Sequence, residues 1–332
     1  MQLYGGIEMK RRPWLGVGLT YVGTVIGAGF ASGQEIWQFF SRHGDWGALG
    51  IGLAGTMFYF IGRSALERGR SGTPHFSAFL SNIYGRYGII LDYLTTLVLA
   101  VGIGVVAVGG GAVLAILTHW PRPLCSIMVL TAIIFSALKG STLIVRINTL
   151  LVPYLLLLTL IIGFWPANNH RAAPQIISQG WWFSALLYVS YNLFTGMTTL
   201  LSLGSILDTP RDSLRAALLA SSLLTLMALL EHRVLLTIGN AGSLPMMTAA
   251  SSIGGPMHWL FGVSLLAAMY TTGIGEAFSL VSRYGRLRAQ WIWLSGLMIG
   301  WPFQTLIASI YPVLGVMSVA FWAPLLVPTR KR

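Results

Sequence analysis

The chain has 332 residues, of which 55% are apolar and 9% charged, and its mean hydropathy is +0.72. A water-soluble chain of this length carries roughly a quarter charged residues, so this composition indicates a membrane protein. The net charge of +12 does not indicate nucleic-acid binding, because the basic residues stand at the ends of apolar segments and form no stripe with interleaved aromatics.

Apolar stretches of about 20 residues predict membrane-spanning helices. The first follows Lys10-Arg11-Arg12 and is too long for the core of a signal peptide, so it is expected to stay as a helix. The sequence predicts about ten spans, with approximate bounds at 14–40, 46–66, 88–118, 122–138, 142–165, 181–206, 212–238, 257–282, 289–302 and 304–327.

The basic residues predict how these spans are oriented. With the N-terminus inside, only Arg42, Arg122, Arg171 and Arg233 of the 21 lysine and arginine residues fall on the outer side. Because cytoplasmic loops carry an excess of lysine and arginine, this asymmetry predicts that both termini are cytoplasmic.

Ten spans divide into two halves of five within a single membrane domain, 1–332, with one repeat at about 14–165 and the other at about 181–327. Because five is odd, the second half enters the membrane in the opposite direction, which makes an inverted repeat. Transporters of this design bind solute near the middle of the bilayer, on discontinuous helices at matching places in the two halves. The first and sixth spans are therefore expected to be broken.

The first span contains four glycines between Gly23 and Gly33, and each weakens a helix by roughly 1 kcal/mol relative to alanine. We predict a break at Gly27-Ala28-Gly29, where freed backbone groups must be buried against protein, water or ligand. The N–H groups of Ala28, Gly29 and Phe30 would then face a substrate carboxylate. The alternative use of these glycines is close helix packing.

The sixth span carries a buried amide, a hydroxyl and a glycine at the matching depth, which favours a second unwound stretch. Its residues Asn192, Phe194, Thr195 and Gly196 are candidates for substrate binding. Asparagine and threonine also form hydrogen bonds between membrane helices, which is the alternative explanation.

Three acidic residues lie at predicted membrane depth and are functional candidates, because burying a charge there is costly. Glu35 lies beyond the predicted break and is expected to meet a substrate ammonium group, bind a cation or carry a proton. Glu276 precedes Arg283 and Arg286 and is expected to form a cytoplasmic gate, while Asp92 is expected to stabilise the start of its helix.

The segment 21–35, Tyr-Val-Gly-Thr-Val-Ile-Gly-Ala-Gly-Phe-Ala-Ser-Gly-Gln-Glu, closely resembles the opening of the YkvI-type bacterial membrane proteins of the amino acid–polyamine–organocation superfamily. The resemblance extends in hydropathy and span count, and in the run 271–275, to most of the chain. It implies an all-α, LeuT-like fold, alternating access and a location in the bacterial plasma membrane.

The resemblance also implies a sodium site, because sodium-coupled proteins of this fold hold an ion between the unwound first helix and the eighth. Here the matching first-helix carbonyls are those of Gly23 and Ile26. The matching groups of the eighth span are the carbonyl of Ala268 and the hydroxyls of Thr271 and Thr272. Those hydroxyls could instead bond to the preceding turn. Related proton-coupled proteins replace the ion with a lysine of the fifth helix, which the fifth span here lacks.

These observations predict a secondary transporter of a small organic solute, such as an amino acid or amine, with sodium as coupling ion and no other cofactor. Proton coupling through Glu35 and a solute receptor that does not transport remain alternatives. An enzyme is not expected, because the sequence offers no nucleophile–base pair and no zinc-protease motif. The sequence leaves the substrate, the direction of transport and the oligomeric state open.

Overall fold

The structure is a computed structural model that describes residues 13–72, 85, 88–139, 142–165, 179–238 and 242–322. Within these residues every regular element is a helix. In chain order the helices are α1 (Pro13–Val25), α2 (Ala28–Ser32), α3 (Gln34–Phe39), η1 (Ser41–His43), α4 (Trp46–Arg70), α6 (Gly88–Thr118), α7 (Arg122–Lys139), α8 (Thr142–Phe164), α9 (Trp181–Gly204), α10 (Pro210–Ile238), α11 (Pro245–Ile253), α12 (Met257–Arg288), η3 (Ala289–Met298) and α13 (Phe303–Trp322). Several predicted features lie outside the described residues: Lys10, Arg11, Arg12, Arg171, Arg330, Lys331, Arg332 and the span end at 323–327.

The first predicted span is broken, as expected, but the break lies slightly earlier than predicted. The N–H of Gly27 donates to the carbonyl of Val25 at 2.9 Å and not to that of Gly23, which ends α1. Gly27 is extended, with φ −95° and ψ −169°, and serves as the N-cap of α2. Ala28 and Gly29 are therefore already helical, and the break falls at Ile26–Gly27. A second interruption follows at Gly33, whose φ of 81° separates α2 from α3.

The prediction that the sixth span is discontinuous was wrong. The helix α9 runs without interruption through residues 192–196. The side-chain amide of Asn192 donates to the carbonyl of Tyr188 at 3.0 Å, and the hydroxyl of Thr195 donates to the carbonyl of Tyr191 at 3.2 Å and to that of Asn192 at 3.0 Å. Polar side chains that bond to their own helix in this way leave the helical ladder intact.

The ninth predicted span also differs from a regular membrane helix. Residues 289–298 form the 3₁₀ helix η3, which continues directly from α12 after a kink at Gly285. With a rise of about 2.0 Å per residue, ten residues reach roughly 20 Å, which is short of the roughly 30 Å of hydrocarbon. The segments Gln290–Met298 and Phe303–Val319 meet at an angle of 114°.

Helix length and surface composition both fit a bilayer. Five described helices are long and apolar enough to cross a membrane, namely α4, α6, α7, α10 and the Met257–Val281 part of α12, and the bent η3–α13 pair would add one. Large apolar side chains are exposed on the outer surfaces of these helices, as expected where lipid and not water covers them. Examples are Leu49, Phe60, Leu97, Phe135, Leu218 and Val263.

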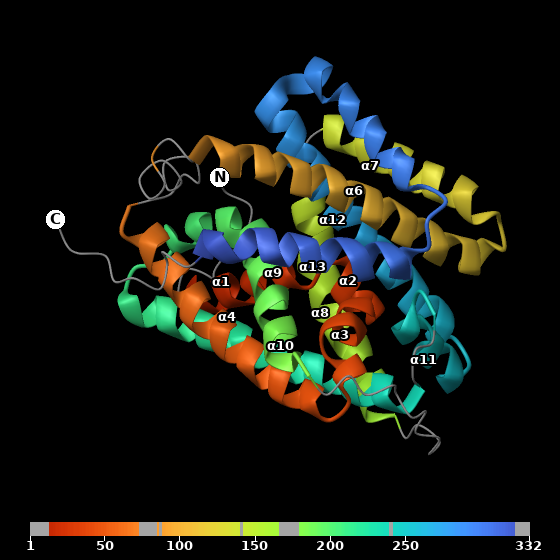
Figure 1. Cartoon of the computed structure of the whole chain (residues 1–332), viewed down its shortest axis with the longest axis horizontal. Helices are drawn as coiled ribbons and strands as arrows, with labels where there is room; N and C mark the ends of the chain where they lie inside the picture. Colours follow the sequence, from red (N-terminus) through yellow and green to blue (C-terminus); the bar gives the residue numbers. More distant parts are fainter. Residues whose placement is uncertain are drawn as a thin grey trace.

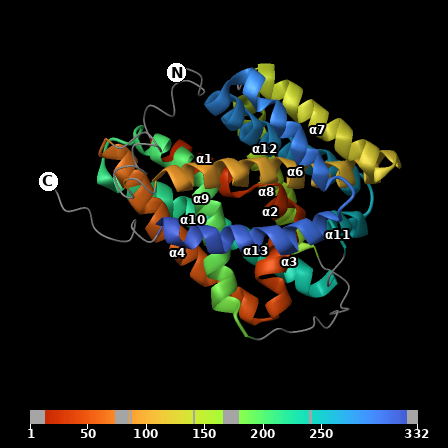
Figure 2. The same ribbon diagram turned by 45° about the horizontal axis from the view of Figure 1, so that its top comes forward.

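The helices form two groups, which Figures 1 and 2 show from two directions. In the first group, α4 packs against α9 and α10, and α1 packs against the same two helices. In the second, α6 packs against α7, α12 and η3. The helix α13 contacts both α9 and α6, and α2 contacts α12. The broken first span therefore lies where the two groups meet.

Glycines allow the helices of the first group to cross closely. A Cβ atom on Gly69 of α4 would overlap the carbonyl of Leu201 in α9, and a Cβ on Gly204 of α9 would overlap the carbonyl of Leu66. Backbone contact of this kind requires small residues and is common between membrane helices.

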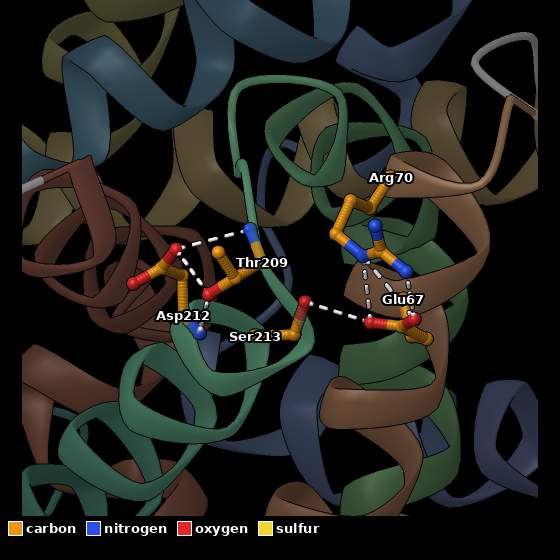
Figure 3. Close-up of polar contacts among 5 residues, drawn as sticks. All are labelled: Glu67, Arg70, Thr209, Asp212 and Ser213. Carbon is orange, nitrogen blue, oxygen red and sulfur yellow. Dashed lines mark hydrogen bonds and ion pairs between the residues drawn. The ribbon is translucent and has the colours of Figure 1, made fainter.

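Polar contacts at the same end of these helices fix the start of α10 (Figure 3). Thr209 and Asp212 cap the helix reciprocally: the Asp212 carboxylate accepts from the Thr209 N–H at 3.1 Å, and the Thr209 hydroxyl accepts from the Asp212 N–H at 3.2 Å. Ser213 donates to Glu67 of α4 at 3.1 Å, and Glu67 pairs with Arg70. These contacts tie α10 to the end of α4.

The glycine contact between α4 and α9 predicts a difference between two substitutions in one helix. Gly69→Val is expected to destabilise the protein by about 1–3 kcal/mol, because the side chain must push against backbone atoms of α9. Gly52→Val is the matched control, because a Cβ on Gly52 meets no atom within 4 Å. Thermal unfolding in detergent measures both, and equal melting temperatures for the two variants would contradict the proposed packing.

Candidate functional site

The centre of the site is the carboxylate of Glu35, which folds back from α3 onto α2. The side chain is 3% exposed. Its carboxylate covers Gly29 so closely that a Cβ at that position would overlap it. The N–H of Phe30 interacts with the same carboxylate, and no backbone bond joins this N–H to the carbonyl of Ile26. Glu35 thus lies at the N–H groups where a substrate carboxylate was expected.

Aromatic side chains surround this carboxylate. The hydroxyl of Tyr191 in α9 lies within interaction range of Glu35, but it completes no hydrogen bond of normal geometry within the described residues. The rings of Tyr191 and Tyr311 lie 4.9 Å apart, and Tyr188 contacts Phe39 and Phe40 with ring centroids 5.5 and 5.0 Å away. The Oε2 atom of Glu35 is buried and has no described partner.

The helix α9, which carries the second predicted substrate-binding segment, packs against α1 and α3, the helices on either side of the first segment, and both segments are helical. Gly196 of α9 lies next to Thr24 of α1, where a Cβ would come within 3.0 Å of its methyl group. Asn192 and Phe194 are buried, while Thr195 is exposed. On the other side of the break, Ala28, Gly29 and Phe30 are all buried in α2.

The predicted sodium ligands fall into two sets. On the first helix, the break takes away the normal helical partners of the carbonyls of Gly23 and Ile26. On α12, the hydroxyls of Thr271 and Thr272 both donate to the carbonyl of Ala268, at 3.1 and 2.9 Å. Both hydroxyls therefore bond to the preceding turn, yet each keeps lone pairs that a cation could use.

The other two acids predicted from the sequence lie on α12 and α6, and Glu276 is in electrostatic range of Tyr311, as Glu35 is. Glu276 packs against α6, where a Cβ on Gly102 would overlap its carboxylate, and its Oε2 atom has no described partner. The side chains of Arg283 and Arg286, its expected partners in a gate, lie outside the described residues. Asp92 occupies the first turns of α6, where its carbonyl accepts from Thr96 at 3.1 Å.

The burial of Glu231 in α10 was not predicted from the sequence. It is fully buried, and neither carboxylate oxygen has a described partner. In the sequence, Glu231, His232 and Arg233 stand out only as polar residues that interrupt the apolar run near the end of the seventh span. The available signal was periodicity, because Leu224, Ala228 and Glu231 recur at helical spacing on the buried face of α10.

A small cavity lies beside these groups, between α2, α4, α9 and α10. Its lining includes Phe30, Phe58, Tyr188, Thr225 and Ala228. It has room for about one water molecule. The described site is thus nearly closed, and it combines buried oxygen atoms with aromatic rings.

Solved structures with the same arrangement of helices are LeuT-like membrane transporters. Mhp1 in its inward-facing conformation matches with a TM-score of 0.59 and 15% identity, over 94% of this chain and 74% of Mhp1. A mutant of the manganese transporter of Eremococcus coleocola matches with a TM-score of 0.55 and 15% identity, over 97% of this chain and 73% of that one. These neighbours are transporters and not enzymes, which agrees with the prediction from the sequence.

Two proteins of Bacillus subtilis (strain 168) are similar over nearly the whole chain. The uncharacterized membrane protein YkvI is 24% identical over 323 residues, which cover 92% of this chain and 93% of YkvI. The uncharacterized protein YyaD is 26% identical over 318 residues, which cover 91% and 92%. The resemblance read from residues 21–35 is thereby confirmed. No family model matches the chain.

The contact between Glu35 and Gly29 can be tested by adding one methyl group. Gly29→Ala is expected to destabilise the protein by about 1–3 kcal/mol, because the new Cβ overlaps the carboxylate. Gly27→Ala should have little effect, since its Cβ meets nothing within 4 Å and its φ is −95°. Melting temperatures in detergent measure both variants.

The double variant Gly29→Ala/Glu35→Ala separates this contact from a general effect on the helix. It should show a smaller loss from Gly29→Ala than the protein with Glu35 intact. Additive losses in the two backgrounds would show that the carboxylate does not lie on Gly29.

Proposed function

We propose that this protein is a secondary active transporter of a small organic solute, such as an amino acid or amine, which works by alternating access. We place it in a bacterial plasma membrane with both termini in the cytoplasm. The observation that carries the proposal is a buried, partly unpaired carboxylate at the break of the first helix, in a fold shared with transporters. Irregular backbone at membrane depth is tolerated where it lines a solute or ion site.

The proposed solute site lies between Ala28–Phe30 and residues 192–196, with Glu35 on one side. Glu35 already interacts with the N–H of Phe30, so a substrate carboxylate would have to displace it. A substrate ammonium group would instead meet a carboxylate oxygen without a described partner. Aromatic rings next to that oxygen also favour a cation. The site therefore favours solutes that carry an amino group.

For the coupling ion we propose sodium, held by Gly23, Ile26, Ala268, Thr271 and Thr272. Support comes from the carbonyls freed at the break and from the grouping of three oxygens on one face of α12, which packs against α2. Hard cations take oxygen ligands of this kind. Proton coupling through Glu35 is the second candidate, favoured by its unpartnered Oε2 atom.

Solute uptake into proteoliposomes tests the transport function. A thermal-shift screen of amino acids and amines, each in sodium and in potassium, first selects a ligand. Uptake of that ligand is expected to rise when an inward sodium gradient is imposed. Uptake that responds only to a pH gradient would replace sodium with protons. Tight binding without any uptake would contradict transport and favour a receptor.

The ligand assignment is tested at Thr272. Thr272→Ala is expected to raise the sodium concentration for half-maximal uptake by about tenfold, which corresponds to about 1.4 kcal/mol for one lost ligand. Ser279→Ala is the matched control on α12, because Ser279 also bonds to the preceding turn, at 2.8 Å from the carbonyl of Gly275. Sodium dependence unchanged in Thr272→Ala, or altered equally in both variants, would contradict the proposed site.

A further inference from the structure

Glu231 is buried in the C-terminal third of α10 without any group that would neutralise a charge. Its side chain is 0% exposed, and both Oε1 and Oε2 lack a described partner. Among the described residues the ion pair is Glu67–Arg70, far along α4 from this site, so no basic side chain pairs with Glu231. Such a carboxyl group inside a membrane protein typically serves ion or proton movement, since structure alone would select an apolar residue.

Tyr188 of α9 links Glu231 to Glu35. Its hydroxyl is buried, has no described hydrogen-bond partner, and lies in electrostatic range of both carboxylates. The two carboxylates also lie in electrostatic range of each other. Tyr188 lines the small cavity described above, which has room for about one water. Two acids and a hydroxyl, each with a buried oxygen that has no described partner, therefore lie within electrostatic range of one another.

His232 extends this group toward the end of the bundle that the sequence predicts to be external. Its Nδ1 atom lies 2.9 Å from the hydroxyl of Ser41 in η1. Its Nε2 atom has no described partner, and its ring packs against Gly47 at the start of α4. The residues Ser41 and Gly47 flank the connection between the first and second spans, so His232 lies next to that connection.

The surroundings contain few other charged groups. The elements packed against α10 are α1, α3, α4, α8, α11 and η1. At this end of α10 they contribute Glu35 from α3, Arg42 and His43 from η1, and Asp45 before α4, which is in electrostatic range of His232. His43 bonds to Ser184 at 3.0 Å.

We propose that Glu231, Tyr188 and Glu35 form a proton-transfer route from the external end of α10 to the broken first helix. No direct hydrogen bond joins these three side chains, so a water must bridge each gap. In one transfer the O–H bond of the Glu231 carboxylic acid breaks, a bridging water passes a proton on to the Tyr188 hydroxyl, and Tyr188 releases its own proton by the same means to the Glu35 carboxylate. Tyr188 ends unchanged, and the negative charge moves from Glu35 to Glu231. External water then supplies the next proton past His232. The route extends the proposed transport function by giving Glu35 a source of protons.

Infrared titration of the full chain in liposomes tests whether the two acids share a proton. The carboxylic-acid bands of the unaltered protein are expected to include both Glu35 and Glu231. Glu231→Gln should remove one band and shift the band of Glu35, which Glu35→Gln identifies. Glu67→Gln is the control, because Glu67 lies at the other end of α4. A Glu35 band that is the same with and without Glu231 would overturn the proposal.

Proton entry tests the route itself and needs no solute. Proteoliposomes with a trapped pH-sensitive dye receive a potassium diffusion potential, negative inside. Glu231→Gln and Tyr188→Phe are expected to slow proton entry by about tenfold or more, while Glu231→Asp retains most of it and Glu67→Gln behaves as unaltered protein. Absence of proton entry in the unaltered protein, or equal rates in Glu231→Gln, would overturn the route.

The two proposals can fail separately. Solute uptake without proton entry would leave the transport function standing and overturn the route. Proton entry that depends on Glu231, in a protein that takes up no solute, would support the route and overturn the transport function. Melting temperatures of all variants show that they remain folded.

Discussion

The arrangement of the site depends on one interaction, between the Glu35 carboxylate and the first turn of α2. A break in a membrane helix frees backbone groups that hydrocarbon cannot satisfy. Here the chain supplies its own acceptor, the carboxyl group of Glu35, which covers Gly29 and meets the N–H of Phe30. The turn at Gly33 makes this contact possible, because its left-handed conformation turns α3 so that Glu35 points back. A side chain at position 29 would prevent it.

The break in the first span could be predicted from the sequence, whereas the continuity of the sixth span could not. Four closely spaced glycines weaken a helix whatever surrounds it, so the break is visible in the sequence. In α9 the deciding fact is where two side chains point: Asn192 and Thr195 bond to their own helix, and Gly196 serves the approach of Thr24. The amino-acid sequence is the same whether these side chains bond to their own helix or line a break, so it cannot distinguish a continuous helix from a broken one. The symmetry that the sequence predicts between the two halves therefore did not extend to the conformation of the sixth span.

Most predicted spans coincide with a described helix, because length and apolarity are set by the bilayer, and five of these helices are long and apolar enough to cross a membrane. The exception is η3, where the apolar stretch 289–298 is present but forms a 3₁₀ helix that bends sharply into α13. Glu231 shows the complementary limit. The polar residues 231–233 interrupt the apolar run near the end of the predicted span 212–238, and α10 runs to Ile238, burying Glu231 and His232 while exposing Arg233. Only the helical period, and not local polarity, shows which of these residues are buried.

Packing and polarity are distributed unequally in this molecule. The helix crossings are close, with backbone contacts at Gly69 and Gly204 that leave little room for relaxation. In contrast, most of the buried polar atoms without described partners lie on Glu35, Tyr188, Tyr191, Glu231 and His232. Each such atom costs free energy comparable to a lost hydrogen bond, and apolar side chains of similar size would fill the same space more cheaply. Stability alone does not account for these atoms, and their concentration on neighbouring helices supports the proposal that this region is the functional part of the fold.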